Sequence, residues 1–163
     1  MWNEAWPSLE IVNLNNSLKA LQTIVEDHDP SEPASAELAR FLVVRTCGYL
    51  ERCVEVCCVS YVRSKSDTRS SSFGASWFGT GANPSPGALI KLVSRFDADW
   101  ARDFESVLSE RDEVLKREIA FLVDIRNKIS HGRSQNIGKR KALDLVGYTR
   151  TVADWFVRQF DPR

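Results

Sequence analysis

Hydrophobic residues recur along most of the chain at the three- and four-residue spacing of amphipathic helices. The first such stretch covers residues 8–25, where Pro7 suits a helix entry. Its apolar face holds Ile11, Leu14, Leu18, Leu21 and Val25. No segment shows clearly the alternation of apolar and polar residues that an exposed strand requires. The pattern therefore predicts an all-α protein.

A long helix is expected over residues 35–63, and it is apolar on two faces. A helix of this kind usually lies at the centre of a bundle. A narrow polar strip separates the two faces and holds Arg45, Gly48, Glu51, Arg52 and Glu55. Charged residues on so buried a helix should be paired or functional.

Residues 64–87 interrupt the helical pattern and are rich in Ser, Gly and Pro. We expect one long irregular loop here, and loops of this length in compact domains are often functional. Phe73, Trp77 and Phe78 lie in it and could stack on bases, pack within the loop or meet a partner.

Four further helical stretches follow the loop. A short one begins near Pro86, a second is possible over residues 100–108, a strong one covers residues 110–131 up to Gly132, and the last covers residues 138–160. The expected architecture is a single domain over residues 1–163, a bundle of four to five main helices with one long irregular loop at about 64–87.

Overall charge does not indicate a nucleic-acid-binding protein, because 22 basic residues balance 22 acidic ones. The distribution is more informative, since the segment from Arg126 to Leu143 holds six basic residues and no acidic one. These residues are Arg126, Lys128, Arg133, Lys139, Arg140 and Lys141. Such a segment can bind a phosphate locally.

The cysteines and the absence of targeting patterns indicate the compartment. Cys47, Cys53, Cys57 and Cys58 lie in one expected helix without CxxC spacing, so buried free thiols are favoured over metal ligands. The N-terminus does not resemble a signal peptide, and no apolar run approaches the roughly 20 residues that span a bilayer. We therefore expect a soluble cytoplasmic protein with no membrane partner.

The segment "FLVDIRNKISHGRS", residues 121–134, breaks the hydrophobic pattern. One core line of the helix reads Leu115, Ile119, Leu122, Arg126 and Ile129. Arg126 thus stands where an apolar residue is expected, and a buried guanidinium needs a carboxylate, a phosphate or polar groups of a second subunit.

Asn127 and His131 are about 40° apart on an ideal helix and share a face. Arg126 lies about 140° from His131, so the two reach one site only if the helix end unwinds or a second protomer contributes. Histidine exchanges protons near neutral pH, and arginine can stabilise charge on a phosphoryl group. This combination suits RNA cleavage without a metal, because no carboxylate cluster for Mg²⁺ accompanies it.

The sequence "RNKISHG" fits an R-N-x-x-x-H motif, and its context includes "RTCGYLE", "NPSPGALIKLVSRF" and "LVDIRNKISHG". Over about residues 9–160 the chain resembles the HEPN superfamily of all-α ribonucleases, and it is most similar to the RiboL-PSP-HEPN branch. That branch is known from prokaryotic toxin–antitoxin and antiphage systems.

The resemblance implies a metal-independent endoribonuclease without a cofactor, which leaves cyclic-phosphate ends. Arg126, Asn127 and His131 match the motif, and two protomers would converge to form one RNA cleft. RNA, a second copy of the chain and a cognate antitoxin protein are the implied partners. Supporting or RNA-binding roles are expected for Lys128, Ser130, Arg133, Arg45 and Glu51.

Other interpretations stay open. Arg126 could pair with Glu51 or Glu55 inside the bundle, and His131 could serve only as a helix C-cap. The domain could bind RNA, a nucleotide or an antitoxin without cleavage, or it could be a plain dimerisation domain. Cations at 139–141 open a helix, which suggests either an anion partner or a solvated face.

Overall fold

The structure, a computed structural model, describes residues 5–78, 83–132 and 136–163. Within these ranges it contains six α-helices and no strand, so the predicted all-α class is confirmed. The helices are α1 (Leu9–Asp27), α2 (Ala34–Lys65), α3 (Thr68–Ser76), α4 (Pro86–Ser94), α5 (Ala98–Ser130) and α6 (Lys139–Gln159).

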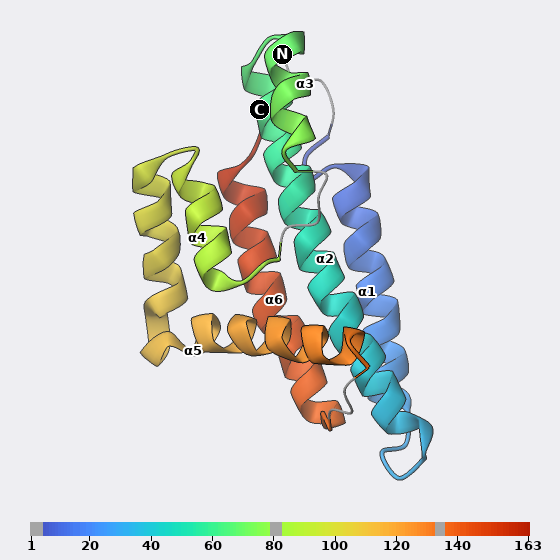
Figure 1. The fold of residues 1–163 in the computed structure, drawn as a ribbon. Coiled ribbons are helices and arrows are strands. Elements are labelled where there is room, and N and C mark those ends of the chain that lie inside the picture. Colours follow the sequence, from blue (N-terminus) through green and yellow to red (C-terminus); the bar gives the residue numbers. More distant parts are fainter. Residues whose placement is uncertain (1–4, 79–82, 133–135) are drawn as a thin grey trace.

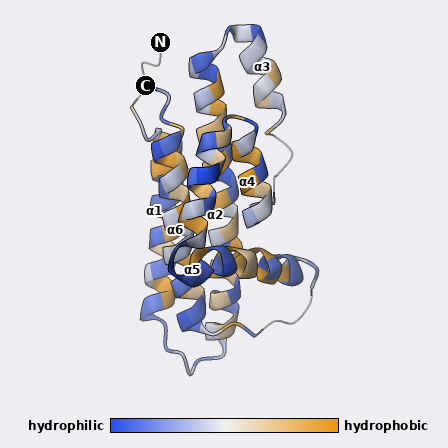
Figure 2. Cartoon of the chain, turned by 90° about the vertical axis from the view of Figure 1, so that its left-hand side faces the viewer, coloured by the Kyte–Doolittle hydropathy of each residue, from blue (hydrophilic) through white to orange (hydrophobic). Residues whose placement is uncertain are grey.

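The long helices α1, α2 and α6 lie side by side along one axis, and the second half of α5 crosses α6 and α2 (Figure 1). The helix α2 lies at the centre and packs most extensively against α6, as its two apolar faces predict. In Figure 2 the helices carry alternating hydrophobic and hydrophilic bands, as expected when one face points to the core. The largest fully buried side chains include Leu42, Leu50, Phe104, Leu122, Leu145 and Phe156.

The helix α5 consists of two arms that meet at a sharp bend (Figure 1). Backbone angles leave the helical region from Glu110 to Glu113. Arg111, Asp112 and Glu113 adopt left-handed conformations with φ of 51°, 57° and 59°. The two arms correspond to the two helical stretches that the sequence predicts on either side of residue 109.

The expectation of an irregular segment over all of residues 64–87 is wrong, because α3 occupies Thr68–Ser76. The Asp67 side chain caps this helix and accepts hydrogen bonds from the backbone N–H groups of Arg69 and Ser70. Serine usually favours turns over helix interiors, but here serine hydroxyls donate to carbonyls one turn earlier, as Ser72 does to Thr68 (2.9 Å).

The helix α3 folds back against the end of α2, and Gly74 permits this close approach. A Cβ at residue 74 would lie 2.8 Å from Cγ1 of Val62. The three aromatic residues of this segment have different environments. Phe78 stacks on Phe96 with ring centroids 6.3 Å apart, whereas Phe73 and Trp77 are 68% and 62% exposed.

Among the residues described, none of the helices combines the length and the apolar composition that a bilayer crossing requires.

Candidate functional site

The RNxxxH segment lies at the C-terminal end of α5, where the sequence places it. The helix ends because Gly132 takes a left-handed conformation (φ 68°) and donates its N–H to the carbonyl of Ile129 (3.0 Å). His131 is the C-cap residue, and its backbone N–H still donates to the carbonyl of Asn127 (3.0 Å). The imidazole is therefore carried on the last turn and is exposed to solvent.

Arg126 lies where α5 crosses α2, and both of its contacts come from α2. One Nη2–H donates to Oε1 of Glu51, and the Nε–H donates to Sγ of Cys47 over 3.4 Å. The side chains of Arg126 and Glu51 are 24% and 27% exposed, so the ion pair is mostly removed from water. Of the two acidic partners that the sequence offers, Glu51 binds Arg126, while Glu55 pairs with Arg52 (2.8 Å).

Burial sets the ionisation of this cluster. Desolvation raises the pKa of Glu51, and the charge and hydrogen bond of Arg126 offset only part of that rise. Desolvation also raises the pKa of the Cys47 thiol, which the Arg126 hydrogen bond offsets in part, so Cys47 is a neutral thiol at neutral pH. Burial alone would lower the pKa of Arg126, but its interactions with Cys47 and Glu51 outweigh this effect. The pKa of Arg126 is therefore raised, and the guanidinium stays charged.

Arg126 keeps donors for a ligand. A guanidinium has about five N–H donors, of which Glu51 and Cys47 occupy two. Glu51 thus orients the arginine without saturating it.

The structure does not join Arg126 and His131. No hydrogen bond connects their side chains among the residues described, and the only non-helical backbone within α5 is at Glu110–Glu113. The helix therefore does not unwind before Ser130, which was one of the two ways of bringing both groups to one site. Asn127, the residue after Arg126 on α5, is half-buried.

The remaining expected site residues differ in their surroundings. Lys128 pairs with Asp124 on its own helix (2.6 Å), and Ser130 is exposed. Arg45 is exposed on α2, where it lines a hollow with Gly48 and Tyr49. Arg133 lies outside the described residues.

The three cations at the start of α6 have partners within the protein. Lys139 donates to the carbonyls of Glu26 and His28 at the end of α1, at 2.6 and 2.8 Å. Arg140 pairs with Asp144, and Lys141 pairs with the buried Glu118. These contacts explain the unusual position of the cations without an anion partner.

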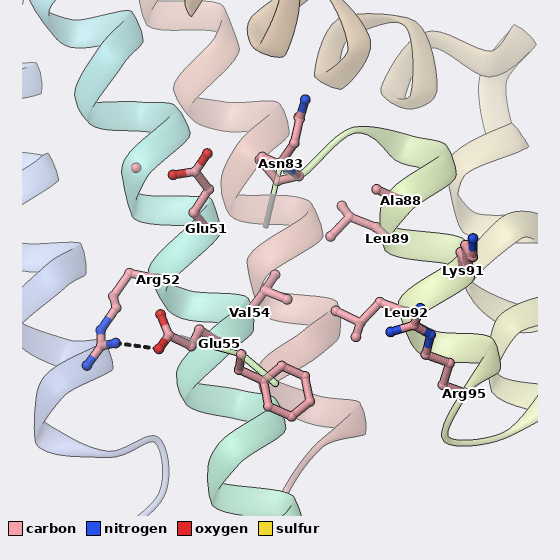
Figure 3. Close-up of a pocket in the computed structure, with 13 residues that line it drawn as sticks. Glu51, Arg52, Val54, Glu55, Asn83, Ala88, Leu89, Lys91, Leu92 and Arg95 are labelled. Carbon is pink, nitrogen blue, oxygen red and sulfur yellow. Dashed lines mark ion pairs between the residues drawn. The ribbon is translucent and has the colours of Figure 1, made fainter. Parts of the chain in front are cut away.

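A cavity of about 370 Å³ between α2 and α4 was not predicted from the sequence. Figure 3 shows Glu51 and Val54 of α2 facing Ala88, Leu89 and Leu92 of α4 across it. Phe78, Asn83, Lys91 and Arg95 also line the cavity. The one feature of the sequence that relates to this cavity is the polar strip of α2. Four residues of that strip form one wall of the cavity: Gly48, Glu51, Arg52 and Glu55.

The part of the chain that the structure describes holds no group of three or more His, Cys, Asp or Glu side chains placed to bind a metal ion. All four cysteines are free and buried in α2.

The fold and the site define an all-α domain whose polar site lies at the end of a long helix and against the central helix. The chain belongs to the RiboL-PSP-HEPN family of the HEPN superfamily, whose family model matches residues 9–161. Membership indicates an RNA-related function. The search of curated proteins and the search of solved structures each returned no match.

Proposed function

We propose that this protein is a metal-independent endoribonuclease that uses Arg126, Asn127 and His131. The observation that carries the proposal is the position of the RNxxxH motif: His131 is exposed at the end of α5, and Arg126, five residues earlier, is held by Glu51 with free donors. Membership in the HEPN superfamily supports the same reaction class.

The proposed reaction is an attack of the 2′-hydroxyl oxygen on the adjacent phosphorus. His131 accepts the proton of the 2′-hydroxyl as general base. The bond from phosphorus to the 5′-oxygen breaks, and the 5′-oxygen takes up a proton that histidine returns. The products are a 2′,3′-cyclic phosphate and a free 5′-hydroxyl. Arg126 stabilises the negative charge on the phosphoryl oxygens, and Asn127 orients the phosphate.

The proposed site is composite and lies between two protomers. The side chain of Arg126 faces α2, and α5 remains helical as far as Ser130. Within one chain, the arginine and histidine side chains therefore point in different directions. A symmetric dimer in which the ends of α5 approach each other would bring Arg126 of one chain to His131 of the other.

We place the activity in the cytoplasm, in a toxin or antiphage effector controlled by a cognate antitoxin protein. The family supports this biological role. Expression of the wild type in a bacterial host should arrest growth, and His131→Ala should relieve the arrest.

The decisive experiment is RNA cleavage by the purified protein in EDTA. The wild type should cut RNA and leave cyclic-phosphate ends. His131→Ala and Arg126→Ala should each lose about a hundredfold or more in rate. The other histidine of the chain provides the control, and His28→Ala should cut like the wild type. Equal cutting by wild type and His131→Ala would rule out the mechanism.

A second candidate function is RNA or nucleotide binding without cleavage. The contacts of Arg126 with Glu51 and Cys47 favour it, because they give the arginine a structural role. RNA binding without turnover, unchanged in His131→Ala, would select this alternative.

A further inference from the structure

The cavity between α2 and α4 lies directly beside the Arg126–Glu51 ion pair. Glu51 belongs to both, since its Oε1 accepts from Arg126 and its side chain lines the cavity. Its Oε2 makes no hydrogen bond within the described residues. The Glu51 side chain is 27% exposed, and its Oε2, which has no hydrogen-bond partner there, is thus available to a ligand.

The size and lining of the cavity fit one nucleoside. Its volume of about 370 Å³ is near the lower limit of small-molecule sites. Val54, Leu89 and Leu92 supply apolar walls, while Glu51 and Asn83 supply hydrogen-bonding groups (Figure 3). Apolar walls with a few polar groups suit a flat heterocycle whose edge carries donors and acceptors.

Two cations at the rim fit a phosphate backbone. Lys91 and Arg95 line the cavity from α4, and neither forms an ion pair within the described residues. The guanidinium of Arg95 lies 6.0 Å from the ring centroid of Trp77.

The cavity continues toward α3 along an exposed aromatic surface. A second hollow of about 220 Å³ shares Phe78, Leu92 and Arg95 with the first and reaches Phe73 and Trp77. An exposed pair of aromatic rings beside an arginine suits stacking of unpaired bases. The two hollows therefore form a path from the Arg126 site along α4 to α3.

We infer that the α2–α4 cavity binds a guanine base of single-stranded RNA, next to the phosphate held by Arg126. This inference rests on the proposed function. An ionised carboxylate only accepts hydrogen bonds, and guanine is the base that offers two adjacent donors, N1–H and the 2-amino group. Adenine and cytosine place an unprotonated ring nitrogen beside their amino group, and uracil has a single N–H between two carbonyls. The Asn83 amide can donate to O6 of guanine.

The test measures RNA binding to the His131→Ala protein by fluorescence anisotropy. Three short oligouridines are compared: one with a single central guanine, one with inosine at that position, and one without substitution. Inosine lacks only the 2-amino group. The guanine RNA should bind about tenfold more tightly than the other two.

Two variants locate the effect in the cavity. Ala88 is exposed and lines the cavity, so the indole of Ala88→Trp should fill it without disturbing the core. This variant should bind all three RNAs equally. Ser94→Trp places the same side chain on an exposed position of α4 that does not line the cavity, and it should keep the preference. Circular dichroism verifies the fold of both.

The outcomes separate the two proposals. Equal binding of the three RNAs, or a guanine preference that persists in Ala88→Trp, overturns the guanine site, while cleavage by the wild type in EDTA would leave the proposed function standing. A wild type that neither cuts nor binds RNA overturns both.

Discussion

Arg126 on α5 donates a hydrogen bond to Glu51 on α2 across 75 residues of sequence. This contact fixes the crossing of the two helices at the point where the RNxxxH motif begins. Glu51 also forms a wall of the α2–α4 cavity, so one carboxylate connects the arginine, the central helix and the cavity.

The pH dependence of stability should reveal the burial of Glu51. Its pKa in the folded protein is raised, so its contribution to stability is fully present below the unfolded-state pKa and is lost as the pH rises through the folded-state pKa. Glutamine does not ionise. The free energy of unfolding of Glu51→Gln minus that of wild type, measured by urea titration, should therefore increase from acid to neutral pH. Glu105→Gln, at an exposed position, is the control. A difference that does not vary with pH would contradict the effect of burial.

Mixed dimers should distinguish a composite site from a site within one chain. Arg126→Ala and His131→Ala are each inactive alone, but a mixed dimer has one complete site if each site takes its two residues from different chains. Equal mixing with subunit exchange should restore about one quarter of wild-type RNA cleavage, because half of the dimers are mixed and half of their sites are complete. If the mixture stays as inactive as its components, both residues of a site come from one chain.

The ion pair of Lys141 and Glu118 should contribute to stability. The Glu118 side chain is only 11% exposed, so Lys141→Ala would leave a buried carboxylate without its partner. We expect a loss of about 1–3 kcal/mol in the free energy of unfolding, measured in urea. Arg140→Ala removes an arginine that is 91% exposed, and it should change stability by less than about 0.5 kcal/mol. Equal losses in the two variants would argue against burial as the cause.

Glycine should stabilise the bend of α5. Arg111 adopts φ 51°, a left-handed conformation that is strained for side chains other than glycine. Arg111→Gly should raise the free energy of unfolding by roughly 0.5–1 kcal/mol after the entropy of the unfolded chain is included. Glu105→Gly lies in the regular part of α5 and should lower it by a similar amount. Destabilisation by both substitutions would show that the bend is not strained.

Hydrophobic periodicity was sufficient to predict the helices that build the bundle. The two apolar faces of residues 35–63 predict a central helix, and α2 is buried on most sides. Periodicity failed at α3, since a short polar helix depends on the Asp67 cap and on packing of Gly74 against Val62. Those contacts are local or tertiary, and a hydrophobic repeat does not encode them.

The sequence by itself determined that Arg126 interrupts a core line and therefore needs a polar partner. Only the tertiary structure decided that Glu51, rather than Glu55, is that partner, because the choice depends on where α5 crosses α2. The sequence likewise placed His131 at a helix end, whereas its direction relative to Arg126 follows from a helix that stays regular to Ser130. The α2–α4 cavity belongs wholly to the tertiary structure, since its walls are brought together from separate segments of the chain.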